Sequence, residues 1–146
     1  MIAIGCDHAG YELKCEVIKH LNEKGIKVID VGTHSTESVD YPVYAKSLCK
    51  MVVNGEVSSG ILICGTGIGM SIAANKVKGI RAAVCSDEFS TEFTRRHNDA
   101  NVMCIGARVL ETEKALKLVD IFLDSPFEGG KHKTRIDMAE NIETDD

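Results

Sequence analysis

The chain has 146 residues, 44% of them hydrophobic and 27% charged, a composition typical of one globular domain with a substantial core. Its net charge of -5 argues against a protein that coats nucleic acid or an anionic membrane. The six cysteines show no CxxC pairing, and no signal-peptide pattern or membrane-length apolar run is present. We therefore expect one cytoplasmic domain over 1–146, with free thiols and with no nucleic-acid or membrane partner.

Strands and helices are predicted to alternate along the chain. Short apolar runs rich in β-branched residues predict buried strands at 2–6, 26–31, 60–64, 80–85 and 101–106. Apolar periodicity and capping signals predict helices at about 11–24, 40–52, 70–76, 87–97 and 112–123. Ser86 or Asp87 is the expected cap of the fourth helix, and Thr112 is the expected cap of the last. Such alternation with short connections predicts an α/β fold, in which a five-stranded parallel sheet lies between two helix layers.

The segment after Pro126 is expected to differ from the rest. Gly129 and Gly130 interrupt the chain, and a short helix with few apolar positions starts at Lys131. We therefore divide the domain into an α/β core at 1–126 and a C-terminal extension at 127–146. The final helix packs either on a partner subunit or on its own domain, and the sequence leaves both open.

A strand, a glycine loop and a helix start follow one another in SGILICGTGIGMSIAANK, residues 59–76. Backbone N–H groups at a helix start favour anions, and Gly65, Gly67 and Gly69 allow a ligand to approach the backbone closely. Cys64 ends the strand, and thiols near helix starts ionise more readily. A thiolate beside oxyanion donors suits proton transfer next to a carbonyl. A buried cysteine beside a tight turn, without chemistry, fits the spacing equally well.

Further candidates follow from the rule that ligands of open parallel sheets bind beyond the carboxyl ends of the strands. The side chains expected there are Cys6, Asp7, His8, Cys64, Cys85, Ser86, Asp87 and Arg108. His97 and Asn98 end the fourth predicted helix, on the opposite rim of the layer, which is awkward for a site within one subunit. We therefore predict that a second subunit contributes its rim to the site.

Several candidates also have interpretations without catalysis. His8 could cap the first helix, Arg108 could be a surface charge, and His97 could serve the helix dipole as a C-terminal cation. Lys131 and Arg135 share a helical face, on which they are either solvated or hold a phosphate together. GxGxxG, GxxxxGK[ST], GxSxG and HExxH are absent from the sequence, so we expect no nicotinamide cofactor and no catalytic metal.

Segments spread in order along the chain resemble the type B ribose-5-phosphate isomerases and their relatives, the galactose-6-phosphate isomerase subunits. They are 5–10 (GCDHAG), 40–42 (DYP), 65–69 (GTGIG), 95–98 (RRHN), 101–108 (NVMCIGAR) and 129–132 (GGKH). The resemblance implies a Rossmann-like fold, no cofactor or metal, and a homodimer or dimer of dimers with active sites across the dimer interface. It also implies interconversion of an aldose phosphate and a ketose phosphate through a cis-enediolate.

The resemblance further implies roles for matching residues. Cys64 would be the base that moves a proton between carbons 1 and 2, and Thr66 would assist proton movement between oxygens. His97 would open the furanose ring, with Asp7 nearby. The enediolate would be stabilised by the backbone of Gly65, Thr66, Gly67, Ile68 and Gly69. The substrate contacts would be His8, Arg108, Lys131 and Arg135 for the phosphate and Asn98 for the sugar. The partner subunit would supply His97 and Asn98, and the origin of Arg108 stays open.

Two positions bear on the subtype. Some relatives replace the cysteine by a carboxylate from the following helix, so Cys64 indicates the cysteine type. Lys131 stands where many relatives have Arg, and lysine keeps the charge but loses the bidentate fork. We expect metal-independent isomerisation of D-ribose 5-phosphate and D-ribulose 5-phosphate in the pentose phosphate pathway. A galactose-6-phosphate or allose-6-phosphate isomerase, and a non-catalytic phosphate- or nucleotide-sensing module, stay open as alternatives.

Overall fold

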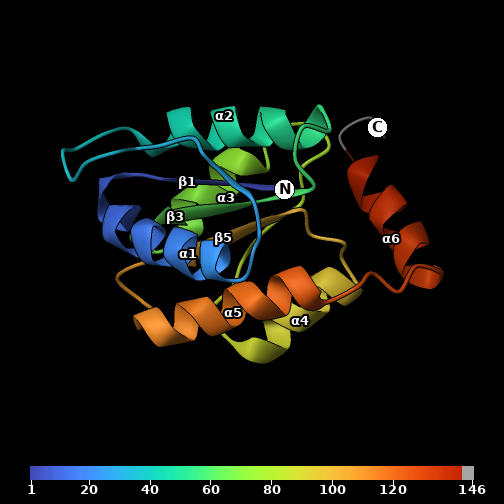
Figure 1. The fold of residues 1–146 in the computed structure, drawn as a ribbon. Coiled ribbons are helices and arrows are strands. Elements are labelled where there is room, and N and C mark those ends of the chain that lie inside the picture. Colours follow the sequence, from blue (N-terminus) through green and yellow to red (C-terminus); the bar gives the residue numbers. More distant parts are fainter. Residues whose placement is uncertain (143–146) are drawn as a thin grey trace.

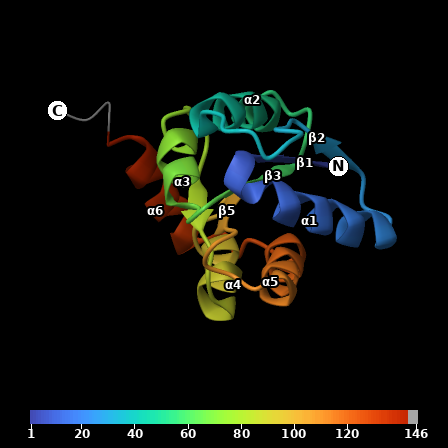
Figure 2. The same cartoon turned by 90° about the vertical axis from the view of Figure 1, so that its left-hand side faces the viewer.

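The computed structural model describes residues 1–142, which form a parallel sheet between two layers of helices (Figures 1 and 2). The elements in chain order are β1 (Ile2–Cys6), the 3-10 turn η1 (His8–Gly10), α1 (Tyr11–Glu23), β2 (Val28–Asp30), α2 (Tyr41–Val53), β3 (Ser59–Cys64), α3 (Ile68–Ala74), β4 (Ala82–Val84), α4 (Glu88–Arg96), β5 (Val102–Gly106), α5 (Thr112–Asp124) and α6 (Lys131–Glu140). The strand order is β2-β1-β3-β5-β4, and all neighbouring pairs are parallel. The predicted α/β fold with a five-stranded parallel sheet is confirmed.

The three central strands end together at one edge of the sheet. Cys6 at the end of β1 is in register with Ile63 of β3, and Cys64 is in register with Gly106 of β5. Whatever follows these strands therefore meets at that edge, where ligands of parallel sheets bind. The predicted strand bounds 26–31 and 80–85 were too wide, because β2 and β4 are edge strands that pair through only a few residues.

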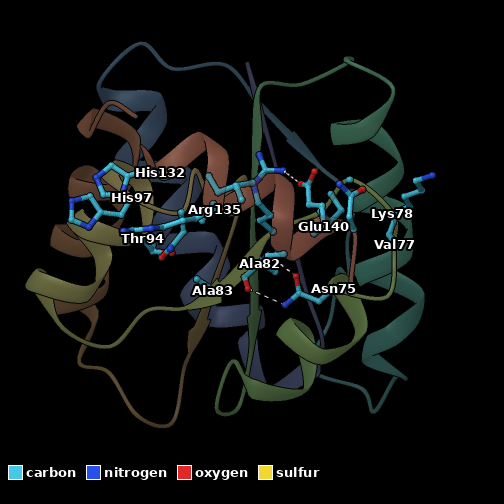
Figure 3. Close-up of a pocket in the computed structure, with 18 residues that line it drawn as sticks. Asn75, Val77, Lys78, Ala82, Ala83, Thr94, His97, His132, Arg135 and Glu140 are labelled. Atoms are coloured by element: carbon cyan, nitrogen blue, oxygen red, sulfur yellow. Dashed lines mark hydrogen bonds and ion pairs between the residues drawn. The ribbon is translucent and has the colours of Figure 1, made fainter. Parts of the chain in front are cut away.

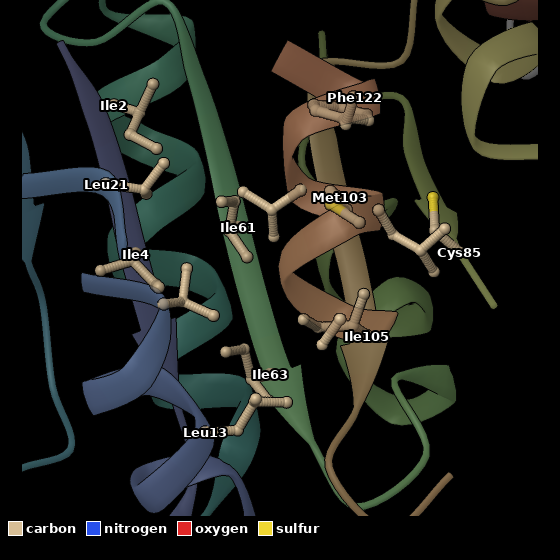
Figure 4. Close-up of a cluster of buried hydrophobic side chains, with 14 of the residues drawn as sticks. Ile2, Ile4, Leu13, Leu21, Ile61, Ile63, Cys85, Met103, Ile105 and Phe122 are labelled. Carbon is tan, nitrogen blue, oxygen red and sulfur yellow. The ribbon is translucent and has the colours of Figure 1, made fainter. Parts of the chain in front are cut away.

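Each face of the sheet carries its own core, because successive side chains of a strand point to opposite faces. Ile61 and Ile63 of β3 face α1 and α5 in a core that also contains Phe122 (Figure 4). Leu62 and Cys64 face the other way, into the core beneath α2 and α3. The alternation thus fixes the side of the sheet on which the Cys64 sulfur lies.

Helix starts differ in detail from the predicted ones. Asp87 caps α4 as expected, since its carboxylate accepts a hydrogen bond from the Ser90 N–H at 2.7 Å. The prediction that Thr112 caps α5 was wrong: Glu111 holds the capping position and Thr112 is already helical. The predicted helix at 70–76 is in fact Ile68–Ala74, so it begins inside the glycine loop.

The final helix, α6, stands apart from the main helix layers, beyond the end of α4 and across a groove from the β4 edge of the sheet (Figure 1). It contacts its own domain, because Ile136 is buried and the Arg81 guanidinium donates to Glu140 at 2.5 Å. Packing of this helix on a partner subunit stays a prediction, and residues 143–146 of the predicted extension lie outside the described residues. Within residues 1–142, none of the helices combines the length and apolarity needed to cross a membrane.

Candidate active site

Cys64 lies at the end of β3 with its side chain turned toward the glycine loop. The residue is buried, at 6% exposure, and its sulfur accepts the N–H of Gly67 at 3.2 Å. A thiolate accepts such a hydrogen bond more strongly than a neutral thiol does. The geometry fits a cysteine that exchanges protons with a ligand held in the loop.

Other buried cysteines are in surroundings that keep them neutral. Burial raises the pKa of Cys49 to about 12 and, against the opposing charge of Lys14, that of Cys6 to about 11. Burial likewise raises the pKa of Cys85 to about 11. These thiols pack as small apolar groups at neutral pH, and the cysteine with a loop amide directed at its sulfur is Cys64.

The loop conformation depends on glycine at particular positions. Gly67 has φ +81, and a Cβ there would come within 3.0 Å of the Ile105 backbone. A Cβ on Gly69 would lie 2.9 Å from the ring of Tyr41, which places that ring against the loop. Thr66 is exposed beside them, and its hydroxyl accepts the Ile68 N–H at 3.2 Å. The loop is therefore held on both sides while Thr66 remains open to a ligand.

Asp7 and His8 follow β1 and reach the same edge of the sheet. The Asp7 N–H donates to the Ile63 carbonyl at 3.1 Å, and its buried carboxylate accepts the Gly10 N–H at 3.1 Å. His8 accepts the Val39 N–H on Nδ1 at 3.1 Å. In a neutral ring this contact leaves the proton on Nε2, which is then a donor for an anion.

Arg108 is brought to this edge by the pairing of β3 with β5. The N–H groups of Ala107 and Arg108 donate to the carbonyls of Cys64 and Gly65 at 2.9 and 3.0 Å. The Arg108 guanidinium lies 3.4 Å from the position that a Cβ on Gly65 would take. An exposed cation therefore stands directly beside the loop of its own chain.

The other predicted site residues lie elsewhere. His97, Asn98 and Arg135 line a groove of about 810 Å³ between α6 and the β4 edge of the sheet, as Figure 3 shows. Lys131 is the first residue of α6 and is exposed. Among the described residues, neither Cys64 nor any residue of 65–69 lines this groove. The candidates thus form a cysteine half and a histidine half within one chain.

The histidine half contains a cluster that we did not predict. The rings of His97 and His132 are stacked, with centroids 4.0 Å apart and planes 9° apart. The Nε2 atoms of both rings lie 3.6 Å from the same carboxylate oxygen of Glu128. The other oxygen of Glu128 accepts a hydrogen bond from Arg96 Nε at 2.6 Å, so the carboxylate is anchored on both sides.

This cluster has the composition of a metal site but a different geometry. Ligand atoms of His97, Glu128 and His132 lie within 4.8 Å of one another, and Zn²⁺ accepts such a ligand set. In stacked rings, however, the nitrogen lone pairs lie in nearly parallel planes and do not converge on one point. A metal ion would require one ring to turn, so the observed arrangement is that of one carboxylate shared by two stacked imidazole rings.

The comparisons with known proteins place this architecture in a family. A family model described as Ribose/Galactose Isomerase matches residues 2–139. The chain belongs to this family. It is 52% identical to ribose-5-phosphate isomerase B of Escherichia coli (strain K12) over 97% of this chain and 95% of the relative. It is 48% identical to ribose-5-P isomerase B of Listeria innocua, over 97% of this chain and 96% of the relative.

Solved structures in the ribose/galactose isomerase family have the same fold. Ribose-5-phosphate isomerase B of Clostridium thermocellum matches with a TM-score of 0.96 and 50% identity, over 98% of this chain and 97% of that one. The enzyme of Mycoplasma genitalium, with bound ribulose 5-phosphate, matches with a TM-score of 0.93 and 40% identity, over 99% and 97%. The resemblance found in the sequence is therefore confirmed at the level of the family.

Sequence reasoning missed some neighbours of the site in this family member. Tyr41 was noticed only as part of a matching segment, although its ring packs on the glycine loop. Glu128 and His132 were not predicted either. Glu128 lies before Gly129 and Gly130, outside α6, so helical spacing does not explain its contact with His132, and the sequence offered no signal for this pair.

Proposed function

We propose that this protein is an aldose–ketose isomerase that interconverts D-ribose 5-phosphate and D-ribulose 5-phosphate. The observation that carries the proposal is Cys64, whose sulfur accepts the Gly67 N–H in a chain 52% identical to a ribose-5-phosphate isomerase B. The bound ribulose 5-phosphate of the Mycoplasma genitalium relative supports the choice of sugar. We also propose that the protein acts in the cytoplasm, in the pentose phosphate pathway.

In the proposed reaction, Cys64 acts as the base on the open-chain sugar. Its thiolate removes the proton from C2 of the aldose, and the electron pair forms the C1–C2 double bond of a cis-enediolate. The backbone of residues 65–69 stabilises the developing charge, and Thr66 moves a proton between O1 and O2. The thiol then returns its proton to C1, which gives the ketose.

Ring opening precedes this step, because ribose 5-phosphate is mostly a furanose. We assign the proton donor to His97: it protonates the ring oxygen as the bond from that oxygen to C1 breaks. The anomeric hydroxyl loses its proton in the same step, and the nearby carboxylate of Asp7 is the proposed acceptor. His97 on the rim and Asp7 on the sheet edge would act on opposite sides of the ring.

Substrate contacts come from both halves of the proposed site. The His8 Nε2 proton and the Arg108 guanidinium are the phosphate ligands of the cysteine half. Those of the histidine half are Lys131 and Arg135, with Asn98 on the sugar. The division between halves is the reason for proposing a homodimer, or a dimer of dimers, with sites shared between subunits. The exposed apolar side chains of Ile68 and Ile72, next to the glycine loop, suit such a contact.

An activity assay tests the proposal directly. Purified protein with EDTA and ribose 5-phosphate should form ribulose 5-phosphate, and Cys64→Ala should lose about 10²–10⁴-fold in kcat with little change in KM. Allose 6-phosphate and galactose 6-phosphate serve as comparison substrates, because the family model covers galactose isomerases. Turnover of a hexose alone would change the sugar and keep the chemistry. Near-full activity of Cys64→Ala would refute the role of this residue.

A further inference from the structure

His97 does not stand alone: its ring is fixed by contacts on two sides. One face stacks on His132 at a centroid distance of 4.0 Å, and Phe93 meets the ring edge-on at 4.9 Å with planes 70° apart. Phe93 belongs to α4, whereas His132 belongs to α6, so two elements far apart in sequence define the orientation of one imidazole.

Glu128 adds a charge to this packing. Its carboxylate is tied to Arg96 at 2.6 Å, and its backbone N–H donates to the Arg96 carbonyl at 3.0 Å. The remaining carboxylate oxygen is equally distant, at 3.6 Å, from both imidazole Nε2 atoms. One negative charge facing two stacked rings favours a proton on one of them and disfavours protons on both, because two stacked imidazolium ions would repel each other.

The two rings have different surroundings. The His132 side chain is 13% exposed and that of His97 is 37% exposed. Desolvation and the charge of His97 lower the pKa of His132, and Lys131 and Arg135 act in the same direction against Glu128. Partial desolvation opposes ionisation of Glu128, but the hydrogen bond and charge of Arg96 outweigh it and lower the pKa of that carboxyl. The lowered pKa of His132 favours its neutral form, and the lowered pKa of Glu128 favours a charged carboxylate beside both rings.

We propose that His132 and Glu128 are positioning residues for His97, rather than substrate ligands. His132 acts as a stacking surface that directs the His97 ring into the groove, and the carboxylate of Glu128 holds Nε2 of that ring at 3.6 Å. This inference rests on the proposed isomerase function, since His97 is the residue that protonates the ring oxygen in that function. It identifies a function for two residues that would otherwise be ordinary surface side chains.

Charged groups reach the His97–His132 stack from several segments. From α4, Arg96 lies 3.4 Å from Glu92 and stacks over Phe93, while Glu128 comes from the segment after α5. From α6, the charges of Lys131 and Arg135 act on His132. Lys78, Arg81 and Glu140 line the same groove as His97. Removing Glu128 leaves both rings without the carboxylate that they share.

Three variants and one control test the inference. His132→Gln removes the stacking ring, His132→Phe restores a ring without nitrogen, and Glu128→Gln removes the charge at constant shape. The matched control is His20→Gln, because His20 also pairs with a carboxylate, that of Asp120 at 2.8 Å, but on α1. Each is assayed for kcat and KM, and ring proton NMR with labelled histidine follows the resonances of the His97 ring.

The expected results separate positioning from general damage. His132→Gln should lose roughly 10- to 100-fold in kcat/KM through misplacement of the His97 ring, and His132→Phe should recover most of that loss. Glu128→Gln should lose roughly 10-fold in kcat/KM and should move the His97 ring resonances, because a carboxylate no longer holds Nε2 of that ring. His20→Gln should match the unaltered protein in all measurements.

Other results would overturn the inference. His132→Gln within twofold of the unaltered protein, or no better performance by His132→Phe, would remove the stacking role. Unchanged His97 ring resonances in Glu128→Gln would remove the role of the carboxylate. The NMR measurement needs no substrate, so it reports on the cluster even if the unaltered protein shows no isomerase activity. Lack of activity in the unaltered protein would refute the proposed function and not the coupling among these residues.

Discussion

Gly67→Ala is the substitution by which the loop geometry can be tested most directly. Gly67 has φ +81, a left-handed conformation that costs a residue with a Cβ about 1–2 kcal/mol. The new Cβ would also lie 3.0 to 3.2 Å from the backbone of Ile105 and Cys104, which cannot swing aside as a side chain can. Overpacking of this kind typically costs a further 1–3 kcal/mol, roughly.

Gly25→Ala separates the two contributions. Gly25 has φ +75, close to that of Gly67, but nothing lies within 4 Å of its Cβ position. The free energy of unfolding of this control variant should therefore fall only by the conformational contribution, about 1–2 kcal/mol. The difference between the two variants in free energy of unfolding should be about 1–3 kcal/mol, the packing cost at Gly67.

Urea unfolding at one fixed protein concentration measures that difference, since association would make the apparent stability concentration-dependent. The two variants should differ more in kcat than in free energy of unfolding. Gly67→Ala displaces the amide that lies 3.2 Å from the Cys64 sulfur, whereas Gly25 lies at the end of α1, away from the loop. Equal stability and equal kcat in the two variants would show that the contacts of Gly67 neither hold the loop nor direct its amide to the Cys64 sulfur.

Two further outcomes are expected. Lys131→Arg should lower KM by roughly 2- to 10-fold with kcat nearly unchanged. The reason is that the bidentate guanidinium should bind the phosphate better, in the ground state and in the transition state alike. A fall in kcat would contradict this prediction. Stability should decline in alkali: burial raises the pKa of Cys6 and Cys85 to about 11 and of Cys49 to about 12. The contribution of these protonated thiols is complete below about pH 8.5, the pKa in the unfolded chain, and is lost as pH rises toward 11–12. Urea midpoints that stay flat between about pH 8.5 and 10.5 would contradict this, because on the order of 1–2 kcal/mol per thiol is expected.

The fold was predictable because its information is local. Runs such as 60–64 are apolar on both faces, as a central parallel strand requires, and β3 is indeed fully paired between β1 and β5. The edge strands were placed but drawn too long, because β propensity at 26–31 and 80–85 does not reveal where pairing stops. Glu111 was missed as the cap of α5 because Thr112 is the better capping residue by type.

The candidate site was only partly predictable, for a different reason. Cys64, the loop and Arg108 meet because strand register brings the ends of β3 and β5 together, which sequence pattern allows one to foresee. The stack of His97 on His132 depends on how α6 is placed beyond the end of α4, and a helix with so few apolar positions encodes that docking weakly. Tertiary placement of a polar helix is what the sequence could not supply.

The separation of the two halves of the site leads to a test of the shared-site proposal. Cys64→Ala and His97→Asn should each be inactive as homodimers, since every site lacks its base or its proton donor. A mixed dimer of the two chains has one site with both substitutions and one with neither, if each site takes Cys64 from one subunit and His97 from the other. Co-expression with two different affinity tags isolates that dimer.

The mixed dimer should then have about half the specific activity of the unaltered protein, because twofold symmetry places one intact site among its two. If both residues served the same chain's own site, neither site of the mixed dimer would be intact and it would be as inactive as its parents. Re-formed dimers of the unaltered chain, carrying the same tags, control for losses during isolation. Restored activity would also explain why His97 and Asn98 line a groove that, within the described chain, Cys64 does not reach.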